Sequence, residues 1–141
     1  DLISEQIRVA SGEKLAIGQD DITFNGHSIE CRINAEDPST FMPSPGHISQ
    51  FHPPGGPGVR IDSHIYSGYD VPPNYDSLIA KIVTHAEDRK TAIKKMLFAL
   101  DETVITGIKT NIDLHKKLLK SDFFINGDFT INTLNKFIQE N

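Results

Sequence analysis

The sequence has few of the features that mark secreted, membrane or nucleic-acid-binding proteins. Its single cysteine, Cys31, cannot form an internal disulfide, which fits a reducing compartment. No apolar run approaches the roughly 20 residues needed to cross a bilayer, and the chain opens directly into helix-like sequence without a signal peptide. Its 19 acidic residues outnumber its 14 Lys and Arg residues, and the net charge of −5 argues against a nucleic-acid partner. We therefore expect a cytoplasmic protein that binds neither a membrane nor nucleic acid.

Length and composition indicate one folded domain over residues 1–141. A chain of 141 residues is long enough to bury a core, and 38% hydrophobic and 23% charged residues are typical of a globular protein. The sequence does not start with Met, which indicates a piece of a longer chain, and its last residues, IQEN, resemble a natural C-terminus.

The first half of the chain reads as one helix followed by a block of strands. Apolar residues at helical spacing predict a helix over 1–12. The segments ITF and HSIECRIN flank Asn25-Gly26 and predict a β-hairpin over 22–34. Further strands are expected at 47–52, 59–66 and 78–85.

The second half of the chain has helical periodicity. An apolar stripe begins after Asp88 and runs to Val104, and Asn111 is placed to cap a second helix. Thr130 is placed to cap a last helix, whose inward residues are expected to be Ile131, Leu134, Phe137 and Ile138. Strands in one block, with helices around them, predict an α+β fold in which helices pack at one face or end of an antiparallel sheet.

The sequence contains none of the common phosphate-binding or nucleophile motifs. The segment PPGGPG (53–58) is followed by neither the Lys nor the Ser or Thr of a P-loop, so we interpret it as a turn. His47, His52 and His64 match no metal-ligand spacing, and no GxSxG elbow is present. We expect no metal site in this chain, and we expect Cys31 to be an inert thiol in the core.

One short pattern leaves two interpretations open. In GHSIECRINAEDP (26–38), Glu30, Arg32 and Asn34 alternate with apolar residues and would share one face of a strand. Periodicity favours an ordinary solvated face. The alternative is that Arg32 points into a cleft shared with a second domain.

Several longer segments together resemble the C-terminal domain of biotin carboxylase. They are GHSIECRINAEDP (26–38), FMPSPG (41–46), PPGGPGVRIDSHIYSGYDVPPNYDSLIAKIV (53–83) and GIKTNIDL (107–114). The resemblance covers nearly the whole chain in order, and it is strongest to the bacterial biotin carboxylase subunit of acetyl-CoA carboxylase. The same domain occurs in pyruvate and acyl-CoA carboxylases, which remain alternatives, as does a purely structural or dimerisation module.

The resemblance implies an ATP-grasp ligase that carboxylates biotin on its carrier protein, which is the first half-reaction of acetyl-CoA carboxylase in fatty acid synthesis. It implies ATP, Mg²⁺ (or Mn²⁺), bicarbonate and biotin as ligands, most of them bound by domains outside this chain. It implies a homodimer that works with biotin carboxyl carrier protein and carboxyltransferase subunits. Because the family's ATP-binding and metal-binding residues belong to sequence upstream of Asp1, we expect the isolated 141 residues to fold without catalysing the reaction.

The resemblance also assigns roles to individual residues near the active site. Arg32 matches the family arginine that contacts bicarbonate and biotin, where its fixed charge would stabilise the biotin enolate. Glu30 and Asn34 share its face and are expected to orient it or to line the cleft.

Three further positions match family sites outside that motif. Ile131 matches a position near the ATP adenine, although its neighbour Asn132 replaces the common His, and Ile131 could instead begin the core stripe of the last helix. Arg60 matches the homodimer interface, where Pro57 replaces a frequent aromatic residue. Asp76 matches a position near the dimer contact, and a plain role at the end of a strand is the alternative.

Overall fold

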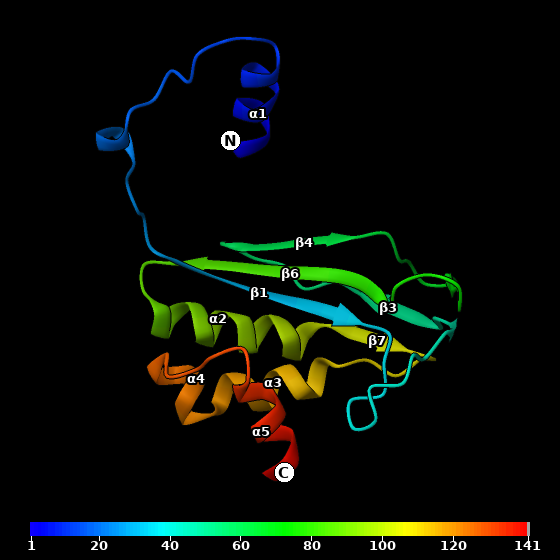
Figure 1. Cartoon of the computed structure of the whole chain (residues 1–141). Helices are drawn as coiled ribbons and strands as arrows, with labels where there is room; N and C mark the ends of the chain where they lie inside the picture. The colour runs from blue at the N-terminus through cyan, green and yellow to red at the C-terminus, as the bar shows by residue number, and fades with distance from the viewer. Residues whose placement is uncertain (141) are drawn as a thin grey trace.

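The computed structural model describes residues 1–140, with side chains to residue 138, and it has an α+β architecture (Figure 1). Asn141, the end that resembles a natural C-terminus, lies outside the described residues. The α+β prediction is confirmed, because antiparallel strands form the sheets and most helices lie on one side of them.

The main sheet has three antiparallel strands, with a long strand at its centre. Its order is β1 (His27–Asn34), β6 (Leu78–Ala86), β4 (Val59–Ser63), so β1 and β4 are edge strands. Two short ribbons extend it at one end. One pairs β2 (Gly46–His47) with β5 (Asp70–Val71), and the other pairs β3 (Gln50–His52) with β7 (Val104–Thr106).

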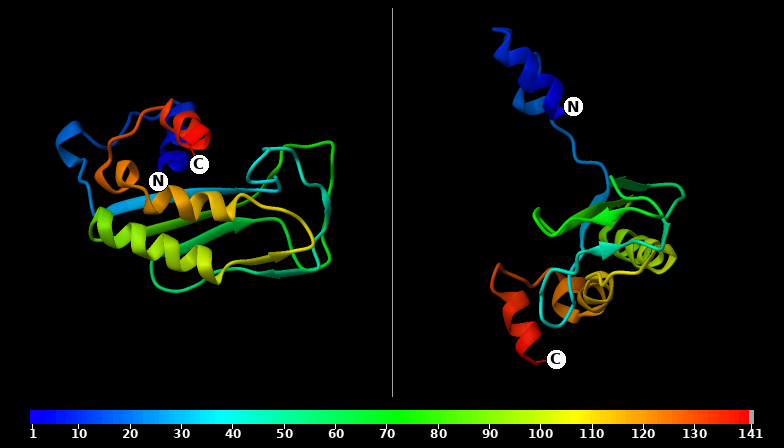
Figure 2. Two further views of the ribbon diagram at one scale, coloured as in Figure 1. Left: turned by 90° about the horizontal axis from the view of Figure 1, so that it is seen from below. Right: turned by 90° about the vertical axis from the view of Figure 1, so that its right-hand side faces the viewer.

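Four helices lie on one side of this sheet (Figures 1 and 2). They are α2 (Arg89–Glu102), α3 (Ile112–Lys120), α4 (Asp122–Asn126) and α5 (Thr133–Glu140). Helix α2 begins where the Asp88 carboxylate accepts a hydrogen bond from the backbone N–H of Thr91 at 2.7 Å, as expected for an N-cap. It packs directly on the sheet, α3 lies beside it near β1, and α4 packs on α3.

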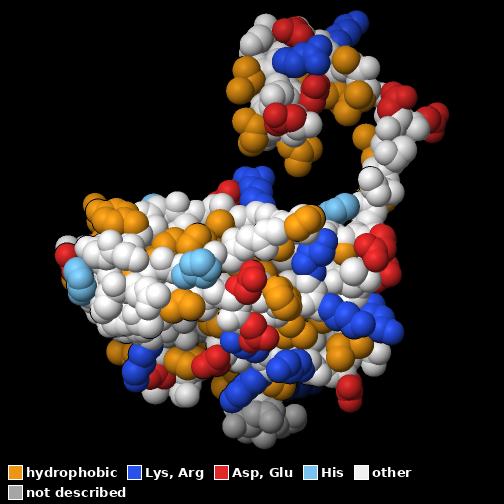
Figure 3. Space-filling model, turned by 180° about the vertical axis from the view of Figure 1, so that it is seen from behind, with side chains coloured by type: hydrophobic (Ala, Val, Ile, Leu, Met, Phe, Trp, Pro, Cys, Tyr) orange, Lys and Arg blue, Asp and Glu red, His pale blue; other side chains and the backbone are white. Residues whose placement is uncertain are grey.

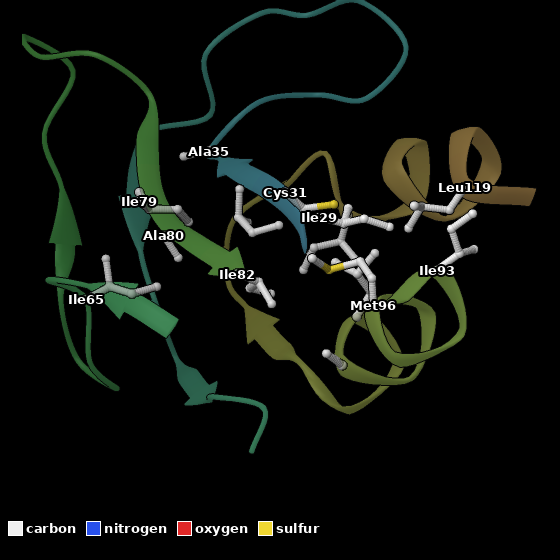
Figure 4. Packing of buried hydrophobic residues seen from close by; sticks show 14 of the residues in the cluster. Ile29, Cys31, Ala35, Ile65, Ile79, Ala80, Ile82, Ile93, Met96 and Leu119 are labelled. Atoms are coloured by element: carbon white, nitrogen blue, oxygen red, sulfur yellow. The ribbon is translucent and has the colours of Figure 1, made fainter. Parts of the chain in front are cut away.

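The core lies between the sheet and α2. Ile29 and Cys31 of β1, Ile82 of β6, and Ile93 and Met96 of α2 turn toward one another (Figure 4). The alternation expected for β1 is confirmed, because its apolar residues are buried and its polar residues point away.

Helix α1 (Leu2–Ala10) stands away from the sheet on the side opposite α2 (Figures 1 and 3). It begins at Asp1, whose carboxylate accepts hydrogen bonds from two backbone N–H groups of the first turn. The helix expected over 1–12 is therefore confirmed, and its apolar side chains are exposed. A 3-10 turn, η1 (Gln19–Asp21), lies in the connection to β1. Within the described residues, every helix is too short or too polar to cross a bilayer.

The hairpin expected over 22–34 is wrong in its first half. Residues 22–26 form no strand, and Phe24 is 98% exposed. Gly26 does take the positive φ of +70° expected for a turn residue, but it packs against Ala86 of β6. β6 pairs with β1 along its whole length from His27 to Asn34, whereas three residues of the ITF segment could offer only a short ladder.

Two helix boundaries also differ from those expected. Helix α2 ends at Glu102, and Val104 starts β7 because the β-branched run after it pairs with β3. The regular hydrogen bonding of the last helix starts at Thr133, three residues after Thr130. Thr130 makes the contacts expected of a cap, because its hydroxyl accepts from the Asn132 N–H at 3.3 Å and its own N–H donates to the Thr133 hydroxyl at 2.8 Å. Ile131 therefore precedes α5 and is 96% exposed, so its expected place in a core stripe is wrong.

Candidate functional site

The candidate site lies on the face of the sheet that points away from α2. Residues directly opposite each other on neighbouring strands share a face, and Arg32 lies opposite Lys81, which lies opposite Asp62. Glu30 of β1 and Arg60 of β4 share this face, since each is two residues from a member of that row. The sheet thus presents a charged surface on one side and the core on the other.

Arg32 occupies the edge of this surface, with its guanidinium open to solvent. Its side chain is 69% exposed, and its Nε donates to Glu30 Oε1 at 3.2 Å along the same strand. Asn34 turns elsewhere, because its side-chain amide donates to Glu36 Oε1 at 3.2 Å. Of the two residues expected to support Arg32, the structure thus brings only Glu30 into contact with its side chain. The remaining N–H donors of the guanidinium fork can therefore bind an anion.

The outer edge of β1 is held by two residues at the start of α3. Asn111 accepts a hydrogen bond from the Asn34 N–H at 2.9 Å and donates to the Arg32 carbonyl at 3.1 Å. His115 Nε2 lies 2.8 Å from the same carbonyl, which can only accept, so Nε2 carries the proton. Burial lowers the pKa of His115, although the contact with the Arg32 carbonyl opposes that shift.

Sequence reasoning missed this pair, because it placed Asn111 as a helix cap. Asn111 does precede α3, but its side chain makes no capping hydrogen bond. Its amide bonds the backbone of β1, which lies 77 residues earlier in the chain. The only signal for Asn111 was its place in GIKTNIDL, and nothing marked His115.

The residues expected at the dimer interface are on or next to the two strands beyond β1, with Arg60 on β4 and Asp76 just before β6. Arg60 is exposed on the edge strand β4, and its guanidinium donates two hydrogen bonds of 2.9 Å to the Asp62 carboxylate. This contact lowers the pKa of Asp62. Asp76 Oδ1 accepts from the Leu78 N–H at 2.8 Å, which is the plain role at the start of a strand.

Ile131, expected near the adenine, is 96% exposed and follows Thr130, which lines an apolar cavity. The cavity has a volume of about 190 Å³ and lies between β1 and the last three helices. Its aromatic walls are Phe123, Phe124 and Phe129, and Glu30 and His115 supply polar groups. An exposed isoleucine next to such a cavity can contact the flat face of an aromatic ligand.

The remaining candidates, Cys31 and the histidines, have surroundings that indicate a structural role. Burial raises the pKa of the Cys31 thiol to about 12, with a smaller contribution from the Glu30 carboxylate, as expected for an inert core thiol. His47 Nδ1 lies 2.9 Å from Asp70 Oδ1, across the β2–β5 ribbon. Among the described residues, no three His, Cys, Asp or Glu side chains are grouped as a metal site requires.

Comparison with known proteins gives one consistent family. The profile described as "Biotin carboxylase C-terminal domain" matches residues 30–136. The biotin carboxylase of Pseudomonas aeruginosa is 57% identical over 136 residues, which cover 96% of this chain and 30% of that protein. This chain therefore spans about a third or less of the curated relatives that it matches.

Solved structures agree in fold. A Campylobacter jejuni biotin carboxylase in a β,γ-ATP complex superposes with a TM-score of 0.89 and 51% identity, over 96% of this chain and 30% of that one. The biotin carboxylase domain dimer of a Hydrogenobacter thermophilus 2-oxoglutarate carboxylase, with MgADP and bicarbonate, gives 0.90 and 45%, again over 96% and 30%.

Proposed function

The chain belongs to the family of biotin carboxylase C-terminal domains, and on this premise we propose that it supplies Arg32 to the active site of an ATP-dependent biotin carboxylase. The observation that carries the proposal is the exposed guanidinium of Arg32 on an ordered strand, with Glu30 holding only its Nε. The reaction class is a ligation in which biotin on its carrier protein is carboxylated with bicarbonate and ATP.

The chemistry of Arg32 suits an anion that forms during the reaction. A guanidinium is effectively never deprotonated, so Arg32 is a poor general base. It instead offers fixed positive charge and a planar fork of N–H donors to bicarbonate and to the enolate oxygen of biotin. Removing one preorganised donor of this kind costs about 3 kcal/mol where it has been measured, which is a factor of about 100 or more in rate.

We propose that this chain contacts ATP only at the adenine ring and does not bind Mg²⁺. The described residues offer no cluster of carboxylates for a metal ion, and we propose that other parts of the protein bind Mg²⁺ and the phosphates. The exposed Ile131 and the neighbouring apolar cavity suit contact with the adenine ring. We expect the purified 141-residue chain to show no biotin-dependent ATP cleavage, and measurable cleavage would contradict this division of roles.

The direct test is Arg32→Ala in the full-length protein. We expect kcat for carboxylation of free biotin to fall about 100-fold or more, with little change in the KM for ATP. Lys81→Met is the matched control, because Lys81 lies opposite Arg32 but directs its Nζ toward Asp62 at 3.8 Å. Unchanged turnover in Arg32→Ala, or an equal loss in Lys81→Met, would refute a specific role for the Arg32 fork.

A second role, in homodimer assembly, is favoured by the position of Arg60. β4 is an edge strand with an exposed arginine, and a relative is described as a biotin carboxylase domain dimer. We propose that Arg60, and with it Asp76, lies at a homodimer contact. Arg60→Glu should yield monomers in sedimentation, while Arg32→Ala should leave the dimer intact. If the domain were only an assembly module, Arg32→Ala would leave turnover unchanged.

The carboxyl acceptor is chosen outside this chain, and we propose acetyl-CoA. Identity is higher to a protein named biotin carboxylase, at 57%, than to the matching domain of a 2-oxoglutarate carboxylase, at 45%. On this proposal the protein is cytoplasmic and works with biotin carboxyl carrier protein and carboxyltransferase subunits in fatty acid synthesis. Assays of the full-length protein with carboxyltransferases for acetyl-CoA, pyruvate and other acyl-CoAs would decide between the acceptors.

A further inference from the structure

The outer edge of β1 lacks a neighbouring strand where Arg32 and Asn34 lie. Among the strands that the structure describes, β1 pairs only with β6, so the backbone groups on its other edge need partners from elsewhere. Three of these groups are bonded by Asn111. Its side chain bonds the Asn34 N–H at 2.9 Å and the Arg32 carbonyl at 3.1 Å, and its backbone N–H donates to the Asn34 carbonyl at 3.3 Å.

Asn111 therefore makes the hydrogen bonds that a residue of a neighbouring strand would make to this edge of β1. Its carboxamide carries one acceptor and donors in the same plane, as a peptide group does, and it spans two backbone groups of β1 as a ladder partner would. Asn111 is only 8% exposed, so these bonds are shielded from water. His115 adds a second donor to the Arg32 carbonyl at 2.8 Å.

The segment that carries Asn111 is itself fixed at several points. Gly107 has a φ of +97° and lies against the His47 carbonyl, where a Cβ would collide. The Lys109 ammonium pairs with the Asp37 carboxylate at 2.6 Å, and the Lys109 N–H donates to Ser44 Oγ at 3.0 Å. Asn111 is thus presented to β1 by an ordered connection between β7 and α3.

We propose that Asn111 and His115 are positioning residues that fix the backbone of Arg32, and so aim its guanidinium at the reacting anion. The inference rests on the proposed role of Arg32. The Arg32 side chain has four rotatable bonds and is mostly exposed, so its backbone and the Glu30 contact are its fixed references. Loss of the Asn111 and His115 bonds to the carbonyl would free the strand edge and misdirect the fork.

A positioning role differs measurably from simple support of the fold. If Asn111 acts through Arg32, its replacement matters only while the guanidinium is present. If Asn111 only docks α3, its replacement lowers stability, and it lowers kcat by the same factor with Arg32 present as with Arg32 replaced.

The experiment is a double-mutant cycle in the full-length protein, with carboxylation of free biotin as the assay. Asn111→Ala is measured in the wild-type background and in the Arg32→Lys background. In the wild-type background we expect kcat to fall between about 10-fold and about 100-fold, with the KM for ATP unchanged. In the Arg32→Lys background we expect a further change of less than about 2-fold.

His115 provides a second arm that does not depend on Asn111→Ala folding. His115→Gln keeps an N–H donor for the Arg32 carbonyl, so its kcat should stay within about 3-fold of the wild-type value. His115→Ala lacks that donor, and its kcat should be about 10-fold lower. Asn135→Ala, on the exposed side of α5, is the matched control and should be neutral. Melting temperatures measured on every variant distinguish a loss of folding stability from a misoriented Arg32 guanidinium.

The outcomes separate the two levels of the reasoning. If Arg32→Lys leaves kcat unchanged, the proposed function itself fails. If Arg32→Lys slows turnover and Asn111→Ala lowers kcat equally in both backgrounds, the proposed function stands and the positioning inference is overturned. Equal losses in His115→Gln and His115→Ala also overturn it, because the donor would then be irrelevant.

Discussion

Cys31 offers a direct test of which face of β1 carries Arg32. The two residues are adjacent in the strand, so their side chains lie on opposite sides of the sheet. A slip of one residue in the pairing with β6 would exchange them, putting the thiol in solvent and the guanidinium in the core. The reactivity of the only cysteine therefore reports the register on which the candidate site depends.

The expected protection follows from burial and from the pKa. Cys31 is 4% exposed, and burial raises its pKa to about 12. At pH 8 such a thiol is roughly one part in 10⁴ thiolate, against about a quarter for an ordinary cysteine of pKa about 8.5. The thiolate fraction alone slows alkylation by roughly 2,000-fold. Limited access slows it further, so labelling should proceed only when the strand opens.

The assay is alkylation of the 141-residue chain by iodoacetamide at pH 8, followed by mass spectrometry. The matched variant carries Cys31→Ala with Arg32→Cys, which moves the thiol by one residue to the exposed face. We expect the variant to be labelled about 2,000-fold faster than the native chain or more, and both at the same rate in urea. Rapid labelling of native Cys31, or slow labelling of the variant, would refute the assignment of faces.

Three further predictions concern the core, a histidine and a turn. Met96→Ala removes a side chain that is fully buried against the sheet, and urea unfolding should show a loss of about 2 to 5 kcal/mol, whereas a loss below 1 kcal/mol would contradict the packing. Because the folded state lowers the pKa of His115, the unfolded chain binds its proton first as the pH falls. The free energy of unfolding should therefore decrease below about pH 6.5, and His115→Gln should flatten that slope in unfolding curves between pH 5 and pH 8. Gly107→Ala places a Cβ against the His47 carbonyl at a positive φ, so we expect a melting temperature lower by several degrees, while Gly12→Ala, where the space is open, should cost only its backbone strain.

Local patterns predicted most of the elements in this chain. The alternation of apolar and polar residues in 27–34 marked both the strand and its buried face, since side chains on a strand alternate strictly. The stripe after Asp88 predicted α2, which begins at Arg89. The same local signals misplaced the end of α2. Val104 belongs to β7, which pairs with β3 some 50 residues earlier in the chain.

The candidate site was predicted only in part. Arg32 and its face followed from alternation, and its chemical role followed from resemblance. Asn34 was expected to support Arg32 through its side chain, but its backbone N–H and carbonyl instead connect that part of β1 to Asn111. Asn111 was predicted to be a cap because Asn before a helix commonly caps it. Its side chain instead bonds backbone groups of β1, which would otherwise be buried without hydrogen-bond partners.

The sequence by itself determined which residues of β1 face the core and which face solvent, because that choice depends only on the two-residue period of a strand. It also determined the family, through motifs spread along the chain. Only the tertiary structure decided that β1 pairs with β6 instead of residues 22–24, and that Asn111 and His115 hold the free edge at Arg32. Those choices join residues between 44 and 83 positions apart, and no local periodicity encodes which distant group will satisfy an exposed strand edge.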